Sequence, residues 1–86
     1  MRRSELEILH EILLEIKKSG DIPLTSIQLR TGLAYDRLLK HIAKLEKYGL
    51  IKTHPLMLTK KGNSFVTDAD KIRPLALDLI KNYFQD

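Results

Sequence analysis

The sequence contains no cysteine, which excludes a disulfide framework and any thiolate nucleophile or metal ligand. No apolar run approaches the ~18 residues that a membrane-spanning helix needs. Acidic residues interrupt the apolar ones throughout residues 1–16, which is unlike a signal peptide. We therefore expect a soluble, cytoplasmic protein with no membrane partner.

Patterns that carry catalysis or metal binding are missing as well. The sequence has no glycine-rich phosphate loop and no spacing that suggests a nucleophile with its base. Its histidines, His10, His41 and His54, lie at no metal-ligand spacing, and we expect His10 to be half exposed on a helix. With 86 residues the chain forms one small domain with little room for a deep pocket. We expect no enzymatic activity, no cofactor and no metal.

What the chain does have is positive charge gathered in its middle third. Its formal net charge is +4. Residues 1–34 carry five basic and five acidic side chains, and residues 65–86 carry three and four. Residues 35–64 carry seven Lys or Arg and only two acids. Such a local excess indicates a polyanionic partner better than the same charge spread evenly.

The first helix follows the capping box SELE at residues 4–7 and ends at Gly20, which suits a left-handed stop. The segment DIPL, residues 21–24, predicts a short strand because Pro23 restricts the residue before it to extended geometry.

A second capping box, Thr25 with Gln28, predicts a helix of about two turns. Leu24 and Leu29 are spaced for a hydrophobic staple across its start. Gly32 is expected to end this helix, and a tight turn follows.

Two stripes run along the predicted helix 35–48. Leu38, Leu39, Ile42, Ala43 and Leu45 recur at helical spacing and predict a buried face. The basic stripe consists of Arg37, Lys40, His41, Lys44 and Lys47. A solvated face normally mixes both signs of charge, whereas this helix has few acids. Contact with nucleic acid is therefore favoured over a solvated face, which remains the alternative.

Residues 50–54 and 56–59 predict two short strands joined around Pro55. Thr59 is placed to cap a further helix through residue 66. Pro74 then either kinks a long helix or begins a new one. The last segment carries an apolar face that either closes the core or pairs with a second copy; it comprises Leu75, Ala76, Leu79, Ile80, Tyr83 and Phe84.

This order of elements predicts a mainly α fold with a small β wing, a winged helix-turn-helix over residues 1–66. Residues 67–86 are expected to form a C-terminal helical dimerisation segment of the same compact unit. The stretches GLAYDRLLKHIAKLEKYGLI and LTKKGNSF resemble small archaeal winged-helix proteins. The nearest resemblance is to the ten-kilodalton chromatin-associated winged-helix family and related transcription regulators.

The resemblance implies a homodimeric transcription regulator or chromatin-associated protein of the nucleoid. Helix 35–48 would enter the major groove of double-stranded DNA, the wing would contact the backbone and the C-terminal helix would form the dimer. Two departures from the family are a wing tip without glycine, and Ala34 where a serine commonly caps the recognition helix. Because Pro74 interrupts the short C-terminal region, we expect a compact dimer rather than a long coiled coil.

The residues expected to contact DNA fall into two groups. Candidates for base edges lie at the start of the recognition helix: Tyr35, Asp36, Arg37, Lys40 and His41. Capping is the favoured role for Asp36. Backbone contacts are expected from Ser26, Gln28, Arg30, Lys44, Lys47, Lys52, Thr53, His54, Lys60 and Lys61. Dimer contacts are expected from Leu75, Leu79, Ile80, Tyr83 and Phe84.

Two other functions stay open. Winged helices also serve as protein-docking adaptors, and that function predicts exposed apolar residues on the recognition helix, where this sequence places Lys and Arg. RNA binding is disfavoured because the chain is only 6% aromatic and offers no paired stacking residues.

Overall fold

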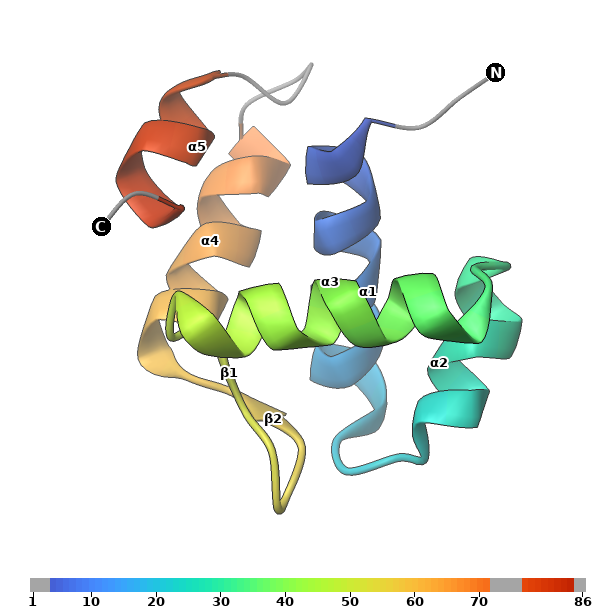
Figure 1. Ribbon diagram of the computed structural model, residues 1–86. Coiled ribbons are helices and arrows are strands. Elements are labelled where there is room, and N and C mark those ends of the chain that lie inside the picture. Colours follow the sequence, from blue (N-terminus) through green and yellow to red (C-terminus); the bar gives the residue numbers. More distant parts are fainter. Residues whose placement is uncertain (1–3, 72–76, 85–86) are drawn as a thin grey trace.

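The computed structural model describes residues 4–71 and 77–84 (Figure 1). These residues form α1 (Glu5–Ser19), α2 (Leu24–Thr31), α3 (Tyr35–Lys47), β1 (Ile51–Lys52), β2 (Met57–Leu58), α4 (Lys60–Lys71) and α5 (Leu77–Tyr83). The two strands pair antiparallel, with Ile51 opposite Leu58 and Lys52 opposite Met57. The predicted mainly α fold with a small β wing is confirmed. No helix within the described ranges combines the length and apolarity needed to cross a membrane.

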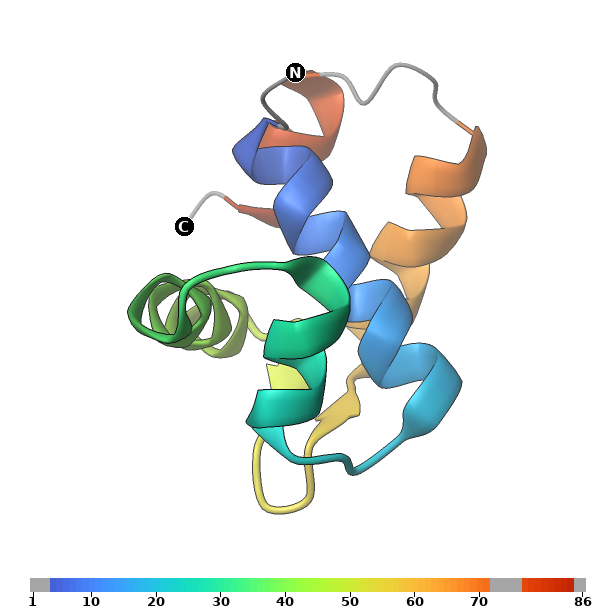
Figure 2. The same cartoon turned by 90° about the vertical axis from the view of Figure 1, so that its right-hand side faces the viewer.

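The helix α1 stands at the centre of the fold. In Figure 1, α3 crosses in front of it, and in Figure 2 α3 is viewed end-on, with α4 on the opposite side of α1. The helix α2 packs beside the C-terminal part of α1, and the β1–β2 hairpin projects below α3. This arrangement leaves the front of α3 and the hairpin on the outside of the molecule.

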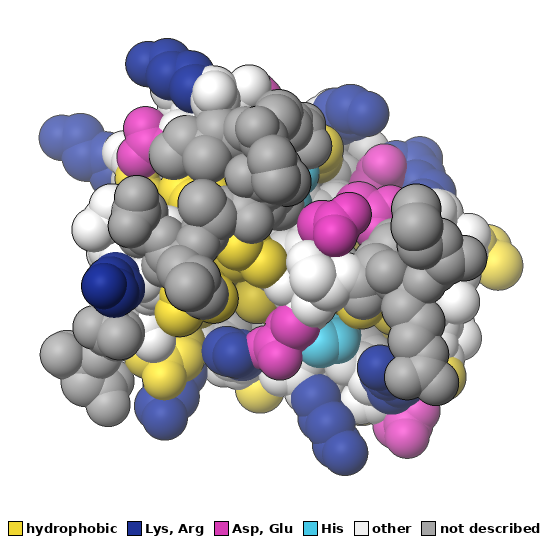
Figure 3. All heavy atoms as spheres, turned by 90° about the horizontal axis from the view of Figure 1, so that it is seen from above, with side chains coloured by type: hydrophobic (Ala, Val, Ile, Leu, Met, Phe, Trp, Pro, Cys, Tyr) yellow, Lys and Arg dark blue, Asp and Glu magenta, His cyan; other side chains and the backbone are white. Residues whose placement is uncertain are grey.

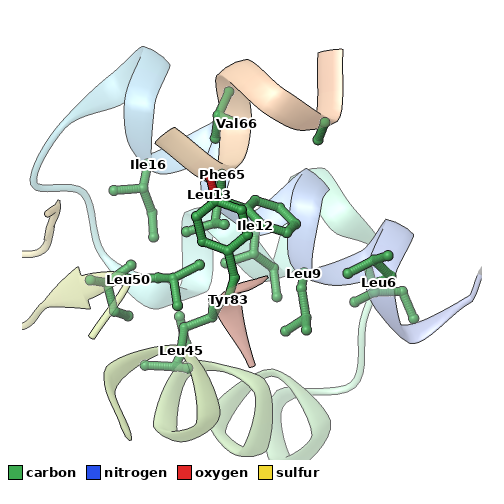
Figure 4. Packing of buried hydrophobic residues seen from close by; sticks show 14 of the residues in the cluster. Leu6, Leu9, Ile12, Leu13, Ile16, Leu45, Leu50, Phe65, Val66 and Tyr83 are labelled. Carbon is green, nitrogen blue, oxygen red and sulfur yellow. The ribbon is translucent and has the colours of Figure 1, made fainter. Parts of the chain in front are cut away.

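The core forms around α1, whose buried residues recur every three or four positions. Phe65 of α4 is fully buried against this face. Its ring meets that of Tyr83 edge-to-face, at a centroid distance of 5.3 Å (Figure 4). It also meets the ring of Phe84 edge-to-face, at 5.5 Å. Such aromatic contacts add to the gain from apolar burial, and here they close the C-terminal segment onto the chain's own core.

Several helix ends form as their residues predict. At the start of α1, the amide of Glu7 donates to Ser4 Oγ at 3.1 Å, and the amide of Ser4 donates to Glu7 Oε1 at 3.3 Å. Gly20 ends that helix as predicted, but its φ of +70° is combined with a ψ of −140°, so the predicted left-handed helical geometry is wrong. At the start of α4, the amide of Gly62 donates to Thr59 Oγ1 at 3.1 Å. Both predicted caps are confirmed.

The strand predicted for residues 21–24 is wrong. This segment is an irregular connection, and Leu24 is already the first residue of α2. A strand needs a hydrogen-bonding neighbour, and within the described residues β1 and β2 pair only with each other. Pro23, with φ −59° and ψ 145°, occupies the N-cap position of the helix.

The capping box and the staple predicted for α2 are also wrong. Because the helix begins two residues earlier than that box requires, Thr25 lies inside it, and no side chain caps this end. The amide of Ser26 instead donates to the Pro23 carbonyl at 3.0 Å. Leu29 is 83% exposed, so it cannot staple the helix start. The predicted end at Gly32 is confirmed, with φ +73°.

Other predicted boundaries shift. The recognition helix ends at Lys47, and the strands shorten because residues 53–56 form the turn between them. The helix predicted to run through residue 66 continues to Lys71. The predictions made for Pro74, Leu75 and Ala76 lie outside the described residues.

His10 was expected to be half exposed, and this is wrong. Its exposed fraction is only 4%, because α4 covers this side of α1. The imidazole packs against the ring of Phe65 at a centroid distance of 6.2 Å, and Nε2 lies 3.6 Å from Asp70 Oδ1. The residue therefore belongs to the α1–α4 contact.

Candidate nucleic-acid interface

Because successive helical residues turn by about 100°, the side chains of α3 point in different directions. The helix has a buried face, an outer face opposite it and two flanks between them. The buried face consists of Leu38, Ile42 and Leu45. Opposite lies the outer face, with Asp36, Lys40, Ala43 and Lys47, all exposed. Between these faces lie the wing flank, with Tyr35, Leu39 and Glu46, and the α1 flank, with Arg37, His41 and Lys44. The predicted site residues of this helix are therefore divided between different directions.

The wing flank is identified by the contact between α3 and the hairpin. Thr53 Oγ1 donates to Glu46 Oε2 at 2.8 Å. On the other side of the turn, the amide of Leu56 donates to Asp21 Oδ1 at 3.1 Å. An open groove of about 470 Å³ lies between these contacts and is partly lined by Ile42. The carboxylate of Glu46 thus holds the hairpin turn to α3, and that of Asp21 holds it to the connection between α1 and α2.

The α1 flank is partly neutralised within the chain. Lys44 donates to the Glu5 carboxylate at the start of α1, and its Nζ lies 5.8 Å from the centroid of the Phe84 ring. This hydrogen bond lowers the pKa of Glu5. Burial lowers the pKa of His41, although the charge of Glu5 opposes this effect. His41 therefore favours its neutral form, and Lys44 contributes less net charge to the surface than the sequence suggests.

The outer face keeps its positive charge. Within the described residues, Lys40, Lys47, Lys52 and Lys60 are exposed and make no ion pair. The Nζ of Lys47 lies 5.3 Å from the centroid of the Tyr48 ring. Figure 3 looks down on the molecule and shows Lys and Arg side chains projecting along the edge that α3 forms. These lysines run from the recognition helix onto the hairpin and the start of α4.

Among the predicted contacts on α2, Arg30 has an internal role. Its Nη1 donates to Glu15 Oε2 at 3.0 Å and to Ser19 Oγ at 2.6 Å, which ties α2 to α1. Ser26 and Gln28 are half-buried on the same helix.

The remaining predicted residues lie at the hairpin and just beyond it. His54 is exposed at the turn with φ +66°, and the His54–Pro55 peptide is cis. Lys61 donates to the carbonyl of Tyr48 at 2.7 Å, so it links α4 to the end of α3. The wing surface available for contact is therefore formed mainly by Lys52, His54 and Lys60.

Sequence reasoning missed the apolar part of this surface. Leu39 and Ala43 were predicted to be buried, and this is wrong: Leu39 is 42% exposed and Ala43 is exposed too. Tyr35 is likewise 42% exposed. The signal lay in the helical period, because Leu39 and Ala43 lie roughly 100° or more from the buried face.

Most of the expected dimer residues are buried in the chain's own core. Leu79, Tyr83 and Phe84 are 1%, 8% and 8% exposed. Ile80 is 38% exposed and borders a hollow of about 110 Å³, which Leu6, Leu9 and Phe84 also line. Hydrophobic atoms are visible on this side of the molecule in Figure 3. Leu75 lies outside the described residues.

A family model described as winged helix-turn-helix matches residues 2–77. The matched range contains every described helix and strand up to the first residue of α5. No curated protein and no solved structure matches the chain.

Proposed function

The chain belongs to the winged helix-turn-helix family, and on this basis we propose that it binds double-stranded DNA by inserting α3 into the major groove. Domains of this kind are a DNA-binding type and are not typically enzymatic. The observation that carries the proposal is the outer face of α3, where Lys40 and Lys47 are exposed and make no ion pair within the described residues. At the finer level, we propose a homodimeric transcription regulator or chromatin-associated protein of the cytoplasmic nucleoid.

The geometry supports a division of roles among the basic residues. Lys40 lies in the first half of α3, whose residues reach base edges in related docking modes, and its ammonium suits guanine O6 or N7. Lys47, Lys52 and Lys60 suit phosphate contacts, which position a protein without reading sequence. His41 and Lys44 lie beside Glu5 of α1, so we place them, with Arg37 of the same flank, at the margin of the interface.

A dimer is proposed on different grounds. Within the described part of α5, Ile80 is the large apolar side chain that stays exposed, and it adjoins an apolar hollow. One small domain meets few phosphates, whereas two copies place recognition helices about one DNA turn apart. Pairing through this patch would cover Ile80 and increase the affinity for DNA.

One observation favours a second function. Tyr35 and Leu39 expose apolar surface on the recognition helix, which is what a protein-docking adaptor requires. The neighbouring lysines on the outer face favour DNA, because an apolar partner would have to desolvate them.

The test is fluorescence anisotropy of a labelled mixed-sequence duplex at several salt concentrations. We expect the logarithm of the binding constant to fall linearly with the logarithm of salt, by about 0.9 for each phosphate contacted. The double change Lys40→Ala with Lys47→Ala should flatten this slope, whereas Lys71→Ala at the end of α4 should not. Absence of binding at the lowest salt would overturn the proposal and bring the adaptor function forward.

A further inference from the structure

An apolar strip runs along the exposed side of α3. Tyr35, Leu39 and Ala43 follow one another at intervals of four residues, so they lie in one row on the helix. All three are exposed, Tyr35 and Leu39 to 42% each. The apolar strip runs from the wing flank, which holds the hairpin through Glu46, to the outer face that carries the lysines.

The strip is not needed to close the core. Leu38, Ile42 and Leu45 already bury the inner face of α3, with exposed fractions of 0%, 6% and 0%. Single exposed apolar residues are common on protein surfaces. Here, however, the described residues expose five large apolar side chains, and two of these lie on the one helix proposed to enter DNA. The position of Tyr35 and Leu39 beside the exposed lysines of α3 therefore indicates a ligand with both apolar and anionic groups.

We propose that the apolar strip reads the 5-methyl groups of thymine in the major groove, with Leu39 as the main contact. This inference rests on the proposed function, and it adds that the protein prefers sites that contain thymine. In the major groove the C5-methyl of thymine is the apolar group on the edge of an A·T pair, and apolar side chains are its usual partners. The same helix face would meet phosphates through its lysines, so one surface serves both groups.

The position of Leu39 suits this role. It lies five positions into α3, next to Lys40, in the part of a recognition helix that reaches base edges. Tyr35 precedes it by one turn and Ala43 follows by one turn, which extends the contact over neighbouring base pairs. A 5-methylcytosine carries its methyl group at the same ring position and should be accepted as well.

The experiment compares two duplexes that differ only in the methyl group. Binding of the full chain to a labelled alternating A·T duplex is measured beside the same duplex with deoxyuridine in place of thymidine. We expect tighter binding to the thymine duplex, by roughly fourfold for each methyl group that becomes buried. Leu39→Ala should bring the ratio of the two affinities close to one.

Leu29→Ala is the matched control, because it truncates a leucine that is 83% exposed on α2, outside the apolar strip. It should leave the thymine-to-uracil ratio unchanged, and thermal melts of both variants would check that they fold. Equal affinity of the unaltered protein for both duplexes overturns the methyl readout and leaves DNA binding intact. An unchanged ratio in Leu39→Ala overturns the role of Leu39. Binding to neither duplex overturns the proposed function and the methyl readout together.

Discussion

Lys44 of α3 donates a hydrogen bond to the carboxylate of Glu5 at the start of α1. The two residues lie 39 positions apart in the chain, and packing of α3 across α1 brings them together. The carboxylate is charged at neutral pH and attracts Lys44, and the contact lowers the pKa of Glu5, which extends this charged state to more acidic pH. One cation of the basic stripe is thereby partly compensated before any DNA arrives.

The pairing of Lys44 with Glu5 predicts that Lys44 and Lys47 contribute unequally to the affinity for DNA. Lys47→Ala should weaken binding to all DNA sequences and reduce the salt slope by about 0.9, the value for one phosphate contact. Lys44→Ala should have a smaller effect, because Glu5 already offsets its charge. Glu5→Gln should tighten binding by releasing Lys44. Anisotropy titrations at several salt concentrations measure all three, and equal losses for the two lysine variants would contradict this assignment.

A second prediction concerns alkaline pH. Burial, aided by the hydrogen bond to Asp68, raises the pKa of Tyr83 to about 12 from the ordinary value of 10.0. The folded chain therefore holds this proton more tightly than the unfolded chain. Between pH 10 and 12 the unfolded state releases the proton first, so the free energy of unfolding falls as the pH rises.

Urea unfolding of the unaltered protein and of Tyr83→Phe across this range measures the effect. The variant lacks the ionisable group, so its stability should decline less between pH 10 and 12. Tyr35 and Tyr48 remain in both proteins and provide the internal control. Parallel pH profiles would show that Tyr83 is not the group responsible.

A third prediction concerns Gly62, where α4 meets the residue before the hairpin. A Cβ atom at this position would overlap the carbonyl oxygen of Leu50, which is backbone and cannot move aside easily. Gly62→Ala should therefore destabilise the fold by about 1–3 kcal/mol or more. Ser64→Ala, on the exposed side of the same helix, should stay within about 0.5 kcal/mol. Urea midpoints compare the two, and similar midpoints would contradict the close approach.

A fourth prediction separates the core of α5 from its exposed side. Leu79 is 1% exposed, so Leu79→Asp would bury a charge and should unfold the chain rather than merely divide a dimer. Ile80→Asp places the same charge on the exposed side and should give folded monomers. Sedimentation equilibrium with circular dichroism measures mass and folding together. A folded dimer of Ile80→Asp would place the dimer contact elsewhere.

Sequence reasoning predicted the helices, the hairpin and their order because their signals are local. The capping box at Ser4, the stop at Gly32 and the cap at Thr59 each depend on residues within a few positions. The strand predicted for residues 21–24 was wrong because strand formation depends on contacts that are not local. An extended residue before proline becomes a strand only if a partner strand is present, and local sequence does not reveal the partner.

The sequence by itself determined that this is a small winged helix-turn-helix domain with its excess positive charge in the middle third. Only the tertiary structure decided which of those charges stay available. Helix packing brings Lys44 into an ion pair with Glu5 and Arg30 into one with Glu15. Lys40 and Lys47, in contrast, face outward. It also decided that Leu39 is exposed, whereas Leu79 and Tyr83 are enclosed. The physical reason is that exposure and ion pairing depend on neighbours distant in sequence, whereas helix formation depends mainly on adjacent residues.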